Sequence, residues 1–387
     1  MKNPMIGWLP QPGSPLTEAT HSLSLLEKSG PRVLLGYTPV ARMNPYQALL
    51  YQECYKYGIA ASEIIPFNAY SSFSELCKMA DATVVHFHWI NSVLQGARDE
   101  ANARWRVDRE KANLEKLVNS GVKIAFTIHN KVSHDAVYMD SELELQQAFL
   151  DNATAIHTMS EAGIDSMQEY AEIDTSKIIL APHPTYEGVY SNHLSRDECR
   201  RALGIRPDEF AFSMFGAIKP YKGLDTLRDA WHTFSKSASR PVRLVIAGAP
   251  DGSEQARSFV DWAMNDPSVI IQPTKIPFEQ VQLFVRCADV GLIPYTRTLN
   301  SGSALAHLSF DVPILVSNEK ALFENLPSGI FETFTGSQDL LSALERAMEK
   351  FEEADLHEDF AILKEARSPR KISAEFSEQL LSKIGLV

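Results

Sequence analysis

The sequence predicts an α/β protein made of two domains, each built on a parallel β-sheet. With 387 residues, the chain is too long for one ordinary hydrophobic core and suits two domains of about 150–200 residues each. Short apolar runs alternate with helical stretches in both halves, a pattern typical of βα units. The alternation starts again after the polar stretch 186–196, which places the domain boundary there.

The first domain is expected over residues 1–190, with 1–30 as an extension before the first strand. Its predicted strands are 32–37, 61–66, 83–87, 123–128, 155–157 and 177–181. Its predicted helices are 45–57, 73–79, 102–119, 141–151 and 161–171. Strands and helices that alternate in this way predict a Rossmann-like domain.

The second domain is expected over residues 191–353 and repeats the same alternation. Its predicted strands are 210–215, 243–247, 269–272, 290–293 and 314–316. Its predicted helices are 197–203, 223–235, 255–265, 278–287, 303–310 and 338–351. The remaining stretch, 354–387, is polar and helical without a strand, and we expect this tail to cross back and pack on the first domain.

Composition excludes several classes of function. A hydrophobic content of 44% with 22% charged residues is that of a soluble globular protein, and no apolar run reaches about 18 residues. Since the N-terminal stretch also lacks an apolar signal core, we expect a cytoplasmic protein. The net charge of −12 argues against binding to nucleic acid. The cysteines show no CxxC spacing and no D-x-D pair occurs, so no metal site is predicted.

The stretch 97–116 combines several arginines and lysines with Trp105, which suits an anionic membrane surface. Nearby acidic residues nearly cancel that charge, so an ordinary surface helix with salt bridges is the favoured interpretation. Peripheral contact with a membrane remains the alternative.

A first candidate for ligand binding is the segment FGAIKPYKG at 215–223. It follows a predicted strand and leads into a helix, the place where α/β sheets bind ligands and where exposed N–H groups favour anions. Lys219 and Lys222 can neutralise a diphosphate, and Gly216 permits close approach of the backbone. The alternative is a solvated basic loop before an ordinary helix.

A second candidate is the segment NSGSAL at 300–305, which also lies between a strand and a helix. Its residues Asn300, Ser301, Gly302 and Ser303 suit phosphate, because backbone N–H groups and hydroxyls all donate hydrogen bonds. The alternative is helix capping by a serine, which needs no ligand.

A third candidate is His129, which follows a buried strand, with His134 and Asp135 in the next loop. A histidine in this place can hydrogen-bond a sugar hydroxyl or a phosphate, or act as a base. The alternative is a core or capping histidine. His86 and His88 alternate with apolar residues at another strand end, and we interpret them as structural or substrate-lining residues.

Together these segments resemble the GT-B glycosyltransferases, and within them the retaining family 4 group and its relatives. The resemblance spans roughly residues 32–350, with the motifs in the same order as in the family. The motifs that carry it are FGAIKPYKG, RLVIAGA, ADVGLIPY, NSGSAL and VPIL in the second half and TIHN, HTMS and APHPTY in the first.

The resemblance implies a metal-independent hexosyltransferase with two facing domains. It implies that a UDP- or GDP-sugar binds the C-terminal domain and that the acceptor binds the N-terminal domain. Lys222 would neutralise the donor diphosphate, Ser301, Gly302 and Ser303 would donate hydrogen bonds to it, and His129 would lie against the donor sugar. The implied acceptor is a glycan or a polyprenyl-diphosphate-linked oligosaccharide of polysaccharide biosynthesis.

The sequence departs from the family at two places. The paired glutamates of the family fall on Thr298 and Ala306, and its arginine falls on Ala217, for which Lys219 is available from a shifted position. Retaining and inverting mechanisms therefore stay open, with Asp135 or His129 as the base of an inverting enzyme. A catalytically degenerate binding subunit and a sugar-nucleotide epimerase are the alternative functions.

Overall fold

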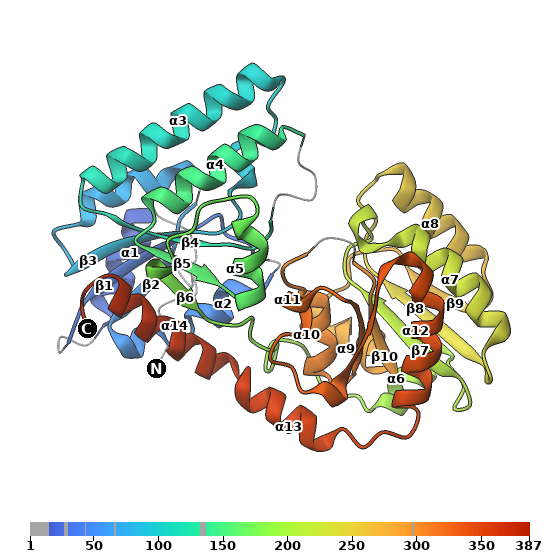
Figure 1. Cartoon of the computed structure of the whole chain (residues 1–387). Helices are drawn as coiled ribbons and strands as arrows, with labels where there is room; N and C mark the ends of the chain where they lie inside the picture. Colours follow the sequence, from blue (N-terminus) through green and yellow to red (C-terminus); the bar gives the residue numbers. More distant parts are fainter. Residues whose placement is uncertain (1–14, 27–29, 43, 66, 132–136, 296–297) are drawn as a thin grey trace. The chain divides into compact units, whose positions relative to one another are not determined.

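The computed structural model describes residues 15–26, 30–42, 44–65, 67–131, 137–295 and 298–387. These residues form two compact units, one of Met1–Pro184 with Pro369–Val387 and one of Thr185–Ser368. Each unit has its own parallel six-stranded sheet with helices on both faces (Figure 1). The predicted α/β class with two Rossmann-like domains is therefore confirmed.

The sheet of the first unit has the strand order β2-β1-β3-β4-β5-β6. Its strands are β1 (Val33–Thr38), β2 (Ile59–Glu63), β3 (Ala82–Phe87), β4 (Lys123–Thr127), β5 (Ala155–Thr158) and β6 (Ile178–Leu180). Its α-helices are α1 (Pro15–Ser24), α2 (Tyr46–Tyr51), α3 (Glu100–Asn119), α4 (Met139–Asn152), α5 (Glu161–Gln168) and α14 (Pro369–Lys383). The 3₁₀ helices are η1 (Cys54–Tyr57), η2 (Phe67–Leu76), η3 (Ile90–Val93) and η4 (Thr175–Lys177).

Strands β1 and β3 are buried along their whole length, as expected for central strands of a sheet covered on both faces. In Figure 1, α3 and α4 cover one face, and α2 and α14 lie against the other. The carboxyl ends of β3 and β4 deliver His88 and His129 to one edge of this sheet.

Two helices of the first unit differ from the prediction. The single helix expected at 45–57 is instead divided into the α-helix α2 and the 3₁₀ helix η1. Gly58, in a left-handed conformation, ends η1. The α-helix expected at 73–79 is instead the 3₁₀ helix η2. There the hydroxyls of Ser71, Ser72 and Ser74 each donate to the carbonyl three residues earlier, which competes with the α-helical pattern.

The sheet of the second unit has the strand order β12-β11-β10-β7-β8-β9. Its strands are β7 (Phe210–Phe215), β8 (Val242–Ala247), β9 (Val269–Gln272), β10 (Val290–Ile293), β11 (Ile314–Ser317) and β12 (Phe331–Phe334). Its α-helices are α6 (Arg196–Leu203), α7 (Leu224–Ser237), α8 (Glu254–Asn265), α9 (Val281–Arg286), α10 (Gly302–Ser309), α11 (Lys320–Phe323), α12 (Gly336–Phe351) and α13 (His357–Ala366). The 3₁₀ helices are η5 (Pro220–Lys222), η6 (Phe278–Gln280) and η7 (Ser328–Ile330).

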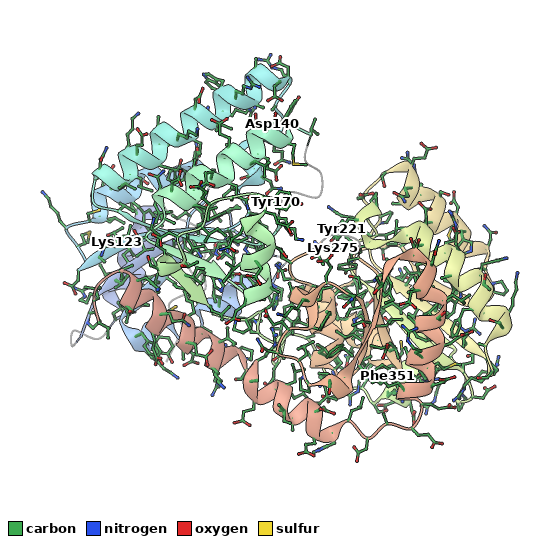
Figure 2. The ribbon with its side chains drawn as sticks, in the orientation of Figure 1. Lys123, Asp140, Tyr170, Tyr221, Lys275 and Phe351 are labelled. Atoms are coloured by element: carbon green, nitrogen blue, oxygen red, sulfur yellow. The ribbon has the colours of Figure 1, made fainter. Side chains whose placement is uncertain are left out.

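Helices α7, α8 and α12 pack on one face of the second sheet, and α6 and α9 pack on the other. Phe351 closes the first of these two cores at the end of α12 (Figure 2). Strand β12 was not predicted, because its sequence FETF is short and only partly buried.

The predicted C-terminal tail is divided between the units. Helix α13 contacts η7 and belongs to the second unit, whereas α14 packs on α2, η1 and β6 of the first. Ile372, Phe376 and Leu380 of α14 are part of the first hydrophobic core. Lys123, at the start of β4, also donates a hydrogen bond to the carbonyl of Ile384 just after α14 (Figure 2).

Within the described part of the chain, every helix is too short or too polar to cross a membrane.

Candidate functional site

Two of the predicted segments meet at the backbone carbonyl of Phe215, the last residue of β7. The ammonium group of Lys222 donates to this oxygen over 3.4 Å, and the hydroxyl of Ser303 donates to it over 2.7 Å. Because Lys222 ends η5 and Ser303 lies in the first turn of α10, one carbonyl joins the loop after β7 to the start of α10. The structure therefore brings the two predicted phosphate-binding segments together.

Lys222 is a buried charge at this junction. Its side chain is 4% exposed, and among the described residues no carboxylate lies within ion-pair distance. Its ammonium group lies 5.0 Å from the centre of the Tyr295 ring, a cation–π contact. Burial lowers the pKa of Lys222 to about 8, with an opposing effect of Tyr221 and a further lowering by Lys219. Lys222 thus offers a positive charge that the described protein does not balance.

Two glycines make this close packing sterically feasible. Gly216 has a φ of +99°, and a Cβ added there would lie 3.0 Å from the Lys222 ammonium group. Gly223 has a φ of +69°, and its Cβ would lie 2.2 Å from the carbonyl oxygen of Pro294. Any larger residue at Gly223 would push apart the loops that follow β7 and β10.

The start of α10 presents backbone donors. Ser301 is the N-cap, and its hydroxyl accepts from the N–H of Ala304 over 3.1 Å. The hydroxyls of Ser301 and Ser303 thus form hydrogen bonds within the protein. For Ser301 this is the helix capping that the sequence offered as the alternative to phosphate binding. By contrast, the N–H groups of Gly302 and Ser303 have no hydrogen-bond partner among the described residues. These two N–H groups are the donors that α10 can offer to an anion.

Lys219 lies at the N-cap of η5 and is half-buried. Burial raises the pKa of Asp251, but hydrogen bonds from Ser253 and the charge of Lys219 lower it overall. The charge of Lys219 is therefore partly shared with a carboxylate of the protein, unlike that of Lys222.

The two positions that carry glutamates in the family offer no acid here. Thr298 is buried, and its hydroxyl donates to the carbonyl of Asn300 while it also accepts from the Asn300 N–H. Ala306 is buried within α10. Neither residue supplies a carboxylate to a nucleotide ribose.

His307, which was not predicted as a site residue, fixes α10 against the sheet. Its ring nitrogens lie 2.8 Å from the Ser303 carbonyl and 3.3 Å from the Ser213 hydroxyl. Its ring fills the space beside Gly291, where an added Cβ would lie 2.4 Å away. The glycine within ADVGLIPY was the only signal in the sequence for this contact.

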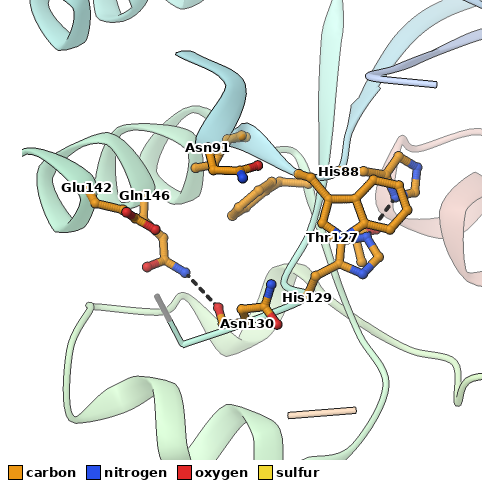
Figure 3. A pocket seen from close by; sticks show the side chains of 10 residues that line it. His88, Asn91, Thr127, His129, Asn130, Glu142 and Gln146 are labelled. Atoms are coloured by element: carbon orange, nitrogen blue, oxygen red, sulfur yellow. Dashed lines mark hydrogen bonds between the residues drawn. The ribbon is translucent and has the colours of Figure 1, made fainter. Parts of the chain in front are cut away.

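In the first unit, His129 follows β4 and is 7% exposed. It lines a cavity of about 40 Å³ together with His88, Asn91 and Gln146 (Figure 3). Its ring stacks on Trp89, with the ring centres 4.2 Å apart, and its Nε2 lies 3.0 Å from Nδ1 of His88. Burial lowers the pKa of His129 well below its usual range, and neighbouring histidines lower it further, so the ring is neutral.

Polar groups line the far wall of this cavity. Gln146 donates from Nε2 to the carbonyl of Asn130 over 3.4 Å (Figure 3). Its buried Oε1 has no hydrogen-bond partner among the described residues. Asn91, Asn130 and Gln146 thus give the lining of this cavity polar side chains.

The remaining predicted residues are placed as follows. Asp135 and His134 lie outside the described residues. His86 and His88 are buried inside the first unit, and no group of three or more described His, Cys, Asp or Glu residues has the arrangement to hold a metal ion. His129 belongs to the first unit and Lys222 to the second.

Solved structures show the same architecture over nearly the whole chain. Sucrose-phosphate synthase from Thermosynechococcus elongatus aligns with a TM-score of 0.61 and 13% identity, covering 91% of this chain and 94% of that one. Alr3699/HepE from Anabaena, in complex with UDP, aligns with a TM-score of 0.65 and 11% identity, covering 91% and 100%. The fold is GT-B. The catalytic domain of starch synthase IV from Arabidopsis thaliana, bound to ADP and acarbose, aligns with this GT-B chain with a TM-score of 0.58 and 12% identity, covering 92% and 100%.

No protein-family model matches the sequence of the GT-B chain. It is similar to D-inositol 3-phosphate glycosyltransferase of Rhodococcus erythropolis, with 38% identity over 66 residues, or 17% of this chain and 15% of the relative. The enzyme of the same description from Gordonia bronchialis is 25% identical over 164 residues, or 40% of this chain and 36% of the relative. The GT-B chain thus matches no more than 36% of the length of either of these curated relatives.

Proposed function

We propose that this chain is a glycosyltransferase that moves a hexosyl group from a nucleoside-diphosphate sugar bound by the second unit. One observation carries the proposal: the buried charge of Lys222 lacks a described carboxylate and lies beside the unpartnered N–H groups at the start of α10. A diphosphate supplies the anion that both features favour. The donor is a UDP- or GDP-sugar.

These groups would act on the leaving group. When the glycosidic bond to the diphosphate breaks, negative charge develops on the phosphate oxygens. Lys222 and the N–H groups of Gly302 and Ser303 would stabilise this charge, and their positions are already fixed by the shared carbonyl of Phe215.

The comparisons support a nucleotide-sugar donor. The HepE structure is described in complex with UDP, and that of starch synthase IV with ADP. The two curated relatives are described as D-inositol 3-phosphate glycosyltransferases, which supports a relationship to the retaining family 4 group.

For the acceptor we propose a glycan or a polyprenyl-diphosphate-linked oligosaccharide in polysaccharide biosynthesis, bound by the first unit. The cavity beside His129 supports a hydroxyl-bearing acceptor, because its lining includes the polar side chains of Asn91, Asn130 and Gln146. A lipid-linked acceptor implies a cytoplasmic protein at the inner membrane face. Trp105, which is 54% exposed on α3 with Arg109 over its ring, is a candidate for that contact.

His129 would meet the donor sugar in a retaining enzyme, whereas His129 or Asp135 would be the base of an inverting one. The anomeric configuration of the product, followed by NMR from the first turnover, decides between the two mechanisms.

We also propose that the reaction needs no metal, because Lys222 and the α10 N–H groups supply the positive potential that a cation would otherwise provide. Turnover should then be unchanged by EDTA and by added Mg²⁺ or Mn²⁺. Loss of turnover in EDTA with recovery on adding a cation would contradict this.

The function is tested by calorimetry with UDP and GDP, followed by hydrolysis and transfer assays with a panel of UDP- and GDP-sugars. We expect one nucleotide to bind and one of its sugars to be consumed. If neither nucleotide binds and no sugar nucleotide is consumed, the proposal is wrong. An epimerase would instead convert the donor sugar without any acceptor.

A second candidate function is a catalytically degenerate binding subunit. Thr298 and Ala306 favour it, because no carboxylate is available at either position to grip a ribose. Such a subunit should bind neither nucleotide in the same calorimetric experiment.

A further inference from the structure

A continuous chain of hydrogen bonds runs through the core of the first unit and ends at His129. The six groups along it are all buried side chains: His157, Thr127, His86, Tyr51, His88 and His129. From His157 to His129, the five donor–acceptor distances are 3.0, 2.7, 2.7, 2.6 and 3.0 Å. Beyond His157, the chain ends on the carbonyl of Ala181, 2.9 Å from Nε2.

The carbonyl of Ala181 determines which group donates and which accepts at this end of the hydrogen-bond chain. A carbonyl only accepts, so Nε2 of His157 carries a hydrogen. Burial lowers the pKa of His157 to about 4, so the ring is neutral and its Nδ1 is an acceptor. Two hydroxyls compete for that nitrogen, and Thr127 at 3.0 Å is nearer than Tyr46 at 3.3 Å. Thr127 therefore donates to His157.

This direction passes along the first half of the chain. Since the single hydroxyl hydrogen of Thr127 goes to His157, its oxygen accepts from Nε2–H of His86. Nδ1 of the neutral His86 then accepts a hydrogen bond from the hydroxyl of Tyr51.

The second half follows by the same rule. The hydroxyl oxygen of Tyr51 accepts from Nε2–H of His88, which leaves Nδ1 of His88 as an acceptor. Nδ1 of His88 accepts from Nε2–H of His129. Each group from His88 to His157 thus donates once and accepts once along this chain, and the hydrogen bonds have a single direction from Nε2 of His129 to Ala181.

We propose that this buried chain fixes the tautomer of His129, with the hydrogen on Nε2 and Nδ1 as a hydrogen-bond acceptor. Any group that meets His129 at Nδ1 must then donate a hydrogen bond. If the proposed function holds, a sugar hydroxyl fits this requirement, and a phosphate or carbonyl oxygen does not. His88, Tyr51, His86, Thr127 and His157 are positioning residues, because they act through His129.

The hydrogen bonds between His86 and His129 can also run in the opposite direction, which makes the inference testable. Without the Thr127 hydroxyl, Nε2–H of His86 would face an apolar group. A buried N–H without an acceptor is less tolerable than an unused acceptor, so His86 should move its hydrogen to Nδ1. His86 would then donate to Tyr51, Tyr51 to His88, and His88 to His129. His129 would end with its hydrogen on Nδ1.

The experiment is ¹⁵N NMR of the imidazole nitrogens in the full chain, with the His129 signals assigned by their loss in a His129→Asn variant. In the native protein and in Thr127→Ser, we expect Nε2 at the position of a protonated nitrogen and Nδ1 at that of an unprotonated one. In Thr127→Val, we expect the two positions to exchange.

A second variant covers the case in which Thr127→Val does not fold. Tyr51→Phe removes the acceptor of His88 Nε2–H and should exchange the His129 signals in the same way. Tyr37→Phe is the matched control, because Tyr37 packs on Tyr51 with ring centres 4.7 Å apart but lies outside the chain. It should leave the His129 signals unchanged.

Two outcomes would overturn the inference: a hydrogen on Nδ1 of His129 in the native protein, or folded Thr127→Val and Tyr51→Phe variants with unchanged His129 signals. Because the NMR readout needs no substrate, it is separate from the proposed function. If sugar transfer is also observed with His129 as a proton acceptor, Thr127→Val should lower kcat/KM by about 10²-fold and Thr127→Ser should restore it.

Discussion

The hydroxyl of Ser303 donates a hydrogen bond to the backbone carbonyl of Phe215 over 2.7 Å. This contact connects residues that are 88 positions apart in the sequence, the end of β7 and the first turn of α10. The same carbonyl also accepts a hydrogen bond from the ammonium group of Lys222. The start of α10 and the buried charge are therefore held in a fixed relation before any ligand arrives.

Ser303→Ala should separate these two elements. Losing the hydrogen bond should lower the free energy of unfolding by about 1 kcal/mol and weaken UDP binding, because α10 is no longer held beside Lys222. Urea unfolding and calorimetry measure the two effects. Ser237→Ala, on the exposed end of α7, is the control and should change neither. Equal UDP affinity in Ser303→Ala and the native protein would count against a role of this contact in binding.

Lys222 should make nucleotide affinity dependent on pH. Its pKa of about 8 means that its charge is lost as the pH rises from 7 to 9. A bound diphosphate favours the charged form, so UDP affinity should fall in this window by up to about tenfold per pH unit above 8. Calorimetry at pH 7, 8 and 9 measures this. Lys222→Met should bind UDP more weakly at pH 7, by about 1–3 kcal/mol, with a flat pH profile. A native profile as flat as that of Lys222→Met would contradict the assignment.

The same lysine affects stability with the opposite sign. Its pKa in the folded protein is lower than the ordinary value of 10.5, so between about pH 8 and 10.5 the unfolded chain binds more protons at this position. The contribution of Lys222 to the free energy of unfolding therefore rises with pH across this window. Comparing urea unfolding of the native protein and Lys222→Met at pH 7.5 and 10 isolates this contribution.

Gly223→Ala should destabilise the second unit more than its left-handed backbone alone explains. Gly223 and Gly336 have the same φ of +69°, but a Cβ at Gly336 meets nothing within 4 Å. Gly336→Ala should therefore cost only the left-handed strain, about 1–2 kcal/mol. Gly223→Ala should cost about 1–3 kcal/mol more, because its Cβ clashes with the Pro294 carbonyl. Similar midpoints of urea unfolding for the two variants would show that the loops can move apart freely.

Phe376→Ala should unfold the first unit more readily. The Phe376 side chain is fully buried on α14 and contacts Tyr51 and His86 in the core. Its loss should cost about 3–5 kcal/mol. Val118→Ala, on the exposed side of α3, should stay within about 0.5 kcal/mol of the native protein. Urea unfolding followed by circular dichroism compares the two, and equal stabilities would exclude α14 from the core.

The strands were largely predictable because a central strand of a parallel sheet is apolar along its length, as VLLGYT in β1 illustrates. Strand β12 was not predicted because FETF is half polar and lies at the sheet edge. Helix η2 was misassigned because its serine hydroxyls bond locally, which no apolar period reveals.

Only the side-chain part of the candidate site was predictable from the sequence. The motifs around Lys222 and Ser303 indicated a phosphate site, but the carbonyl of Phe215 that joins them has no signature in a sequence. The hydrogen-bond chain to His129 was likewise invisible, since Tyr51 and His86 are 35 residues apart and only folding brings them together. Alternating His86 and His88 was the one hint, and it indicated a structural role without the partners.

Helix α14 gives the first unit an unusual order of assembly. The polypeptide of this unit is interrupted by the whole of Thr185–Ser368, so α14 is synthesised only after the second unit. Until then, the apolar surface that Ile372 and Phe376 will cover stays exposed, although all six strands of the sheet have been synthesised. The second unit is continuous in sequence and can complete its own core earlier. Of the two units, the one whose synthesis starts earlier therefore completes its core later.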